Sequence, residues 1–196
     1  MSTHQDTENA DRLLDGRVWD DFCDEMKKVG RHVLRPEVPA DPLTRAEGYR
    51  YLTRVIRSAF DIFTEHADPE FPVIYRPCDE IVKYGGDDPD KYLQKCVVSG
   101  DYDYLIRGQR GTIQSVSFLT QGSNFGQGGT MLPTGFLDTD TLEVAEDGSF
   151  EIRLSAKEQA GNWLPMTEDT QALLIRQTFG DRSTESIAEL EIECLQ

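Results

Sequence analysis

The residues best suited to chemistry in this sequence are arginines and aromatic residues beside predicted strands. In the segment GNWLPMTEDTQALLIRQTF (residues 161–179), Asn162 and Trp163 precede an apolar strand that contains Arg176. The predicted strand face around Arg176 is otherwise mostly apolar, so this charge needs either a carboxylate partner or a wet cavity. Because the guanidinium group is a planar fork, it binds carboxylates and phosphates well. Both interpretations, a ligand site and an internal ion pair, remain open here.

A second group of candidates lies on the segment DYDYLIRG (residues 101–108), where period-two alternation predicts a strand. Its Arg107 is placed next to a turn, and Tyr104 shares the apolar face of the strand. Trp163 has two interpretations. It fills part of the core at a hinge whose backbone Pro165 fixes, or it forms the wall of a pocket. The hypothesis is one concave site at an end of a β-sandwich. Its proposed ligand-binding residues are Arg107, Arg176, Trp163, Asn162 and Tyr104.

Other kinds of site have no motif in the sequence. The glycine-rich segment 121–135 matches neither the phosphate-loop nor the dinucleotide-binding pattern. The three histidines, His4, His32 and His66, have no metal-ligand spacing, and no nucleophile elbow is present. We therefore expect no metal and no cofactor. An enzyme of the hydrolase or lyase class would need a titratable group with a shifted pKa beside the arginines.

The charge balance limits the choice of partners. The chain has 196 residues with 20 Lys and Arg against 36 Asp and Glu, a formal net charge of −16. Such acidity argues against nucleic acids and anionic membranes as partners. No apolar run reaches the length of a membrane span, and the first 16 residues lack the features of a secretory signal. Four widely spaced cysteines with no C-x-x-C pair indicate reduced thiols in a cytoplasmic protein.

The elements that must position these residues fall into two groups. Apolar spacing predicts helices over residues 17–34 and 41–66, the second with an Asp41-Pro42 start signal. The region that follows shows no regular period, and one helical turn is predicted within residues 87–98. Beyond it, alternation predicts strands at 101–108, 112–120, 149–156, 171–179 and 188–195. Residues 142–144 and 149–156 flank a hairpin signal at 146–148.

Helices that precede a run of antiparallel-type strands define the fold class α+β. We expect N-terminal helices packed on an antiparallel β-sandwich of jelly-roll-like form. The predicted organisation is a disordered tail over residues 1–16 and a single domain over residues 17–196. Within that domain, residues 17–68 form the helical layer and residues 72–196 the β-sandwich.

Three motifs, YLIRGQRGT, NWLP and LLIRQTF, together resemble a bacterial family, the domain-of-unknown-function family 1214. The resemblance covers residues 100–196, and the preceding helices are similar to those of stand-alone members. It implies a jelly-roll-like β-sandwich and supplies no activity. The sequence departs from the family where Gln177 and Thr178 separate the strand arginine from Phe179.

The resulting hypothesis is a protein that binds a small anionic or ring-containing molecule. One alternative is an enzyme that uses the same pocket. Another is a homodimeric interaction module whose helices form the dimer face, which exposed Trp19, Phe22 and Phe60 would support.

Overall fold

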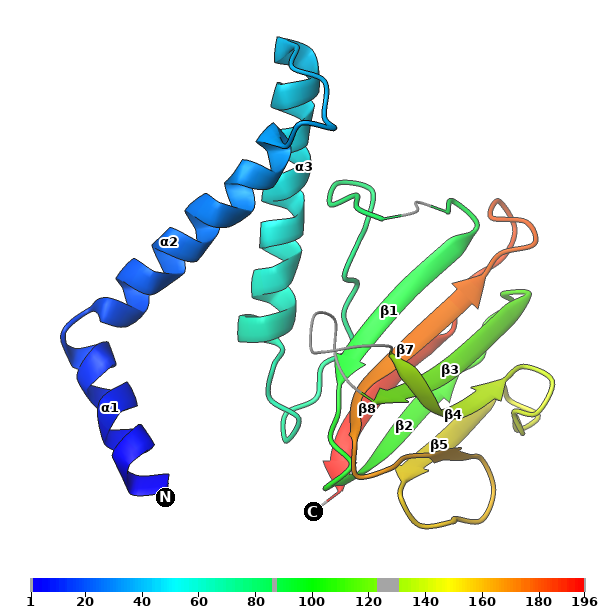
Figure 1. Ribbon diagram of the computed structural model, residues 1–196. Coiled ribbons are helices and arrows are strands. Elements are labelled where there is room, and N and C mark those ends of the chain that lie inside the picture. Colours follow the sequence, from blue (N-terminus) through cyan, green and yellow to red (C-terminus); the bar gives the residue numbers. More distant parts are fainter. Residues whose placement is uncertain (1, 86–87, 123–130, 196) are drawn as a thin grey trace. The chain divides into compact units, whose positions relative to one another are not determined.

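The computed structural model describes residues 2–85, 88–122 and 131–195 (Figure 1). The chain divides into two compact units, Met1–Val55 and Ile56–Gln196. The sequence analysis predicts a single domain over residues 17–196. Most of the glycine-rich segment discussed above, residues 123–130, lies outside the described residues.

Helices make up the first unit: α1 (Ser2–Leu14), α2 (Arg17–Arg31), the short 3₁₀ turn η1 (His32–Leu34) and most of α3 (Pro42–Phe60). The helix predicted over residues 17–34 is confirmed by α2 and η1. The predicted start of the next helix is also confirmed, since the Thr44 amide donates to Asp41 Oδ1 at 3.0 Å. A one-turn π-helix η2 (Asp61–Glu65) extends α3 to the predicted end near His66.

Helix α1 occupies a segment for which a disordered tail is predicted. The polar composition of residues 1–16 argues against a buried face, but it does not prevent a helix from forming. An ion pair between Arg12 and Asp21 (2.6 Å) links α1 to α2, and Gly16 joins the two helices with a left-handed backbone at φ 82°.

Two four-stranded sheets form the second unit. One has the order β1-β7-β3-β4, from strands β1 (Lys91–Val97), β7 (Thr170–Thr178), β3 (Ser115–Gly122) and β4 (Leu132–Asp138). The other has the order β6-β5-β2-β8, from strands β6 (Trp163–Pro165), β5 (Ser149–Ser155), β2 (Asp103–Gln109) and β8 (Glu189–Leu195). All strand pairs are antiparallel except β5 with β6. The predicted α+β class is confirmed.

Both sheets contribute to one hydrophobic core. The predicted inward alternation of β5 is confirmed, since Ile152 and Leu154 are fully buried and Phe150 nearly so. On the facing sheet Phe118 and Ile175 are fully buried and belong to the same cluster. Each such side chain contributes about 1.5–3 kcal/mol by leaving water. This shared core fixes the two sheets against each other.

Two local predictions were wrong, and one strand, β4, was not predicted. Residues 91–97 form strand β1 in place of a helical turn, because Cys96 and Val98 point into the core and β7 supplies backbone partners. Residues 132–138 form β4 at the end of the glycine-rich segment. Residues 142–144 form no strand, because β5 pairs with β2 and not with the segment just before it.

Candidate functional site

Arg176 lies on the face of β7 that points away from the hydrophobic core. Its neighbours Ile175 and Gln177 are fully buried and face inward. Across the sheet, Arg176 is in register with Leu93 on β1 and Ser117 on β3. The arginine is half-buried, and no carboxylate of the described residues forms an ion pair with it. Its charge therefore has no internal partner in the described part of the chain.

A cavity of about 470 Å³ opens beside Arg176, at the end of the sheet where β1 begins and β7 ends. Leu93 and Pro89 provide apolar surface there, and the remaining lining residues are mostly charged. The basic ones come from three segments: the loop before β1, the β1–β7 strand pair and the loop after β7. They are Arg76, Lys83, Lys91, Arg176 and Arg182.

The acidic residues of the cavity already have partners. Glu80 pairs with Arg76 at 3.2 Å, and Asp88 pairs with Lys91 at 3.1 Å. Asp79 accepts backbone hydrogen bonds from Val82 (2.6 Å) and Ile81 (2.7 Å), and these lower its pKa. Five basic residues thus face three acidic ones in a chain whose net charge is −16. The cavity is a local region of positive charge on an acidic protein.

Two of the arginines are held against aromatic rings. The Arg76 guanidinium lies over the Tyr92 ring at 4.3 Å, and that of Arg182 lies over the Phe179 ring at 4.5 Å. Such contacts orient a guanidinium without neutralising its charge. Arg76 Nε is also buried with no hydrogen-bond partner in the described residues. Arg182, like Arg176, has no ion-pair partner in the part of the chain that the structure describes.

The structure does not bring the five predicted site residues together. Arg107 and Asn162 line a second, more open cavity of about 680 Å³ beside β5. Arg107 is paired there with Glu193 (2.8 Å) and Glu151 (3.1 Å). The side chain of Asn162 connects the loop at Glu143 to strand β5. Its Oδ1 accepts from the Glu143 amide at 2.7 Å, and its Nδ2 donates to the carbonyls of Glu143 (2.8 Å) and Glu151 (2.9 Å).

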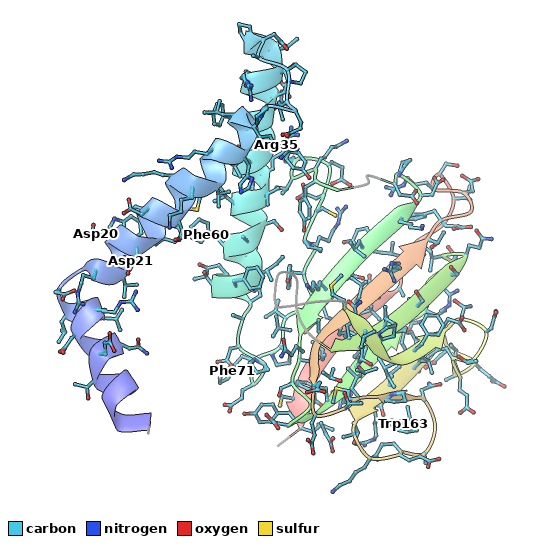
Figure 2. The ribbon with its side chains drawn as sticks, viewed as in Figure 1. Asp20, Asp21, Arg35, Phe60, Phe71 and Trp163 are labelled. Atoms are coloured by element: carbon cyan, nitrogen blue, oxygen red, sulfur yellow. The ribbon has the colours of Figure 1, made fainter. Side chains whose placement is uncertain are left out.

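The two predicted wall residues line neither of these cavities. Tyr104 is fully buried in the core, where its hydroxyl accepts from the Ser99 amide at 2.9 Å and burial raises its pKa. Trp163 is half-buried at the start of β6, and its Nε1 donates to the Ser155 carbonyl at 3.0 Å (Figure 2). The fully buried residue of the NWLP motif is Leu164. Trp163 and Arg176 also belong to different sheets.

Arg76, Lys91 and Arg182, which line the cavity with Arg176, are not among the residues predicted from the sequence. Arg76 and Arg182 lie in loops with no periodicity, and Lys91 lies on the strand that was taken for a helical turn. Assignment of residues 91–97 as a strand would still not have shown that β1 pairs with β7, and this pairing is what brings Leu93 into register with Arg176. The two loop arginines had no signal in the sequence pattern.

Metal-binding clusters and membrane-spanning helices are absent from the described residues. No group of three or more His, Cys, Asp or Glu side chains among them is arranged to hold a metal ion. No helix in the described part of the chain has the length and apolar composition needed to span a membrane. All four cysteines are free thiols, and burial raises the pKa of Cys96 to about 12.

The fold and cavity thus define an α+β protein with two four-stranded sheets and a cationic cavity at one sheet end. Its fold is similar to the crystal structure of an uncharacterised protein from Burkholderia cenocepacia, with a TM-score of 0.90 and 49% sequence identity. That similarity covers 95% of this chain and 52% of the other, so the chain spans about half the length of its relative. The VPA0106 protein from Vibrio parahaemolyticus matches at a TM-score of 0.42 and 18% identity, over 55% of this chain and 31% of that one. No protein-family model and no curated protein matches the sequence.

Proposed function

We propose that the protein binds a small anionic molecule in the cavity beside Arg176. The observation that carries the proposal is the half-buried guanidinium of Arg176, which has no ion-pair partner among the described residues and lies in a predominantly basic cavity. A half-buried charge without a partner is unfavourable unless water or a ligand solvates it. An anion there supplies the charge that the described residues of the chain do not.

The lining of the cavity favours a carboxylate or a phosphate with a short apolar part. Arg176 and the ring-stacked Arg182 present planar forks, which bind two oxygens of such groups at once. Leu93, in register with Arg176, offers apolar surface directly beside the charge. A cavity of about 470 Å³ is in the size range of small-molecule sites. Tyr104 and Trp163 lie outside it, so stacking on a ring is not part of the proposal.

The chemistry of the cavity favours binding over catalysis. An enzyme needs a general acid or base whose pKa is brought near neutrality. Asp79, Glu80 and Asp88 all have lowered pKa values, because backbone amides and basic side chains stabilise their charged forms. These carboxylates are therefore ionised at neutral pH and already hydrogen-bonded. These three carboxylates therefore give the enzyme alternative no general acid or base, and the remaining candidate group in the lining is the thiol of Cys78.

Membership of the domain-of-unknown-function family 1214, with its jelly-roll-like sandwich, is also part of our proposal. It is supported by the two-sheet arrangement of residues 91–195 and by the placing of the YLIRG and LLIRQTF motifs on β2 and β7. The cytoplasmic location and the exclusion of nucleic-acid partners stay predictions from composition and charge.

Thermal unfolding in the presence of anions tests the binding proposal. The probes are sulfate, inorganic phosphate and a series of short mono- and dicarboxylates, each against chloride at equal ionic strength. Wild-type protein is compared with Arg176→Ala and with Arg153→Ala, a control arginine that lines the second cavity. A ligand at about 100 times its Kd stabilises by roughly 2.7 kcal/mol, a rise of about 5–10 °C in Tm for this chain length.

We expect at least one probe to raise the Tm of the wild type and of Arg153→Ala, but not that of Arg176→Ala. An equal rise in the wild type and Arg176→Ala would overturn the proposal. So would a loss of the effect in Arg153→Ala alone, which would move the site to the second cavity. Absence of any rise in the wild type across the whole series would also contradict it.

A further inference from the structure

Two guanidinium groups line the cavity beside Arg176 without an ion-pair partner among the described residues. Arg76 and Lys91 are each paired with a carboxylate of the same lining. Arg176 and Arg182 differ from them, since neither forms an ion pair in the part of the chain that the structure describes. A ligand with one negative charge neutralises one of these two arginines and leaves the other without a partner.

The two arginines come from different segments of the chain. Arg176 is half-buried on β7, and Leu93 of β1 is in register with it. Arg182 is exposed on the loop that joins β7 to β8. Figure 1 shows this loop at the same end of the sheet as the start of β1. One cavity is therefore lined by a guanidinium on the sheet face, a guanidinium on a loop, and apolar surface from Leu93 beside the first.

Hydrogen bonds to the backbone fix the loop that carries Arg182. Glu185 Oε2 accepts from the amides of Gly180 (2.9 Å) and Gln114 (3.1 Å), so it ties the loop to the segment just before β3. The Arg182 guanidinium is itself held over the Phe179 ring at 4.5 Å. Because this arginine is positioned before a ligand binds, less conformational entropy is lost on binding.

We propose that the ligand of this cavity is a dianion with two separate negatively charged groups, one bound by Arg176 and the other by Arg182. This inference rests on the proposed function, because it names the class of anion that the same cavity takes. Two positive charges held in one cavity repel each other, and a dianion removes that repulsion. Each guanidinium can bind one carboxylate through two hydrogen bonds. The apolar surface of Leu93 suits the short carbon chain of a dicarboxylate, which is the probe chosen here.

Isothermal titration calorimetry with matched probes tests the charge requirement on the full chain. Succinate and monomethyl succinate are nearly equal in size and differ by one negative charge at about pH 7.5, where both carboxyl groups of the diacid are ionised. Malonate and glutarate, each against its monomethyl ester, vary the separation of the two carboxylates. At equal low ionic strength, we expect the wild type to bind at least one diacid about fivefold or more tightly than its monoester.

A matched pair of variants assigns that preference to Arg182. Arg182→Ala should bind the diacid no more tightly than the monoester, while its affinity for the monoester stays at the wild-type value. Arg153→Ala removes another exposed arginine that has no ion-pair partner among the described residues, and it should keep the full preference. Arg176→Ala should lose the binding of both probes. A general effect of lost positive charge would weaken the two probes together in both exposed-arginine variants.

The outcomes separate this inference from the proposed function. Arg176-dependent binding with equal affinity for each diacid and its monoester would overturn the dianion and leave the anion site in place. An Arg182→Ala protein that keeps the wild-type preference would also overturn it. Inorganic phosphate that binds more tightly than every diacid and depends on Arg182 would show that the charges belong on one group. If no probe binds in an Arg176-dependent way, the proposed function itself fails.

Discussion

The side chain of Gln177 on β7 is joined by two hydrogen bonds to the backbone of Ala188, just before β8. Its Nε2 donates to the Ala188 carbonyl at 3.0 Å, and its Oε1 accepts from the Ala188 amide at 2.6 Å. Both residues are buried, and β7 and β8 belong to different sheets. Nε2 also donates to Gln94 Oε1 at 2.8 Å. A buried amide thus links the two sheets and fixes one end of the loop that carries Arg182.

Replacement of Gln177 by leucine should lower the free energy of unfolding by about 2–4 kcal/mol. The apolar side chain leaves the amide and carbonyl of Ala188 buried without partners, and each such group costs about 1–3 kcal/mol. Urea denaturation measures the loss. Gln171→Leu, the same change at an exposed position of β7, is the matched control and should leave the stability nearly unchanged. Equal stability of Gln177→Leu and the wild type would show that the link is not needed.

A second close contact explains the glycine of the IRG motif. Gly108 on β2 is in register with Phe150 on β5, and a Cβ at position 108 would lie 2.7 Å from Phe150 Cε1. Gly108→Ala should therefore cost about 1–3 kcal/mol of stability through overpacking. Phe150→Leu in the same chain should recover part of that loss, since the smaller side chain frees the space. Thermal or urea unfolding of the single and double variants measures the coupling, and strictly additive losses would contradict the contact.

The outcome for the site shows what period and composition can and cannot predict. Alternation located β2, β3, β5, β7 and β8 because each buries one face in the common core. It did not show to which side of the sheet Arg176 points; the structure places Ile175 and Gln177 on the buried side and Arg176 on the other. Local periodicity does not give the order of the strands in the sheets. The five candidate residues were therefore predicted to share one site, although β7 lies in one sheet and β2 and β6 lie in the other. Arg182 depends on a loop position that only the folded chain fixes.

The pKa of Asp79 gives a pH dependence with a defined sign. Backbone hydrogen bonds from Val82 and Ile81 lower this pKa in the folded state, below the value of about 3.9 expected for an unfolded chain. The stabilisation by Asp79 is therefore fully present above about pH 4 and is lost as the pH falls through the folded-state pKa. Asp79→Asn should be less stable than the wild type at pH 7, and the difference should shrink below about pH 4. Urea denaturation of both proteins between pH 7 and below about pH 4 measures this difference in the free energy of unfolding. A difference that does not change with pH would show that the Asp79 carboxylate does not provide the stabilisation.

The two strand arginines should differ in their contribution to stability, although the sequence gives them the same role. Arg176 has no ion-pair partner among the described residues, so Arg176→Leu should leave the free energy of unfolding within about 1 kcal/mol of the wild type or raise it. Arg107 pairs with Glu193 and Glu151 on the two neighbouring strands. Arg107→Leu leaves these carboxylates without their shared partner and should lower the free energy of unfolding slightly, because exposed ion pairs contribute little to stability. Denaturation at low and at high salt distinguishes the two arginines. The stability lost in Arg107→Leu should become smaller as salt is added, because salt screens exposed ion pairs. The stability of Arg176→Leu relative to the wild type should not change with salt. A large loss of stability in Arg176→Leu would make that arginine a structural residue and would remove the main support for an anion site.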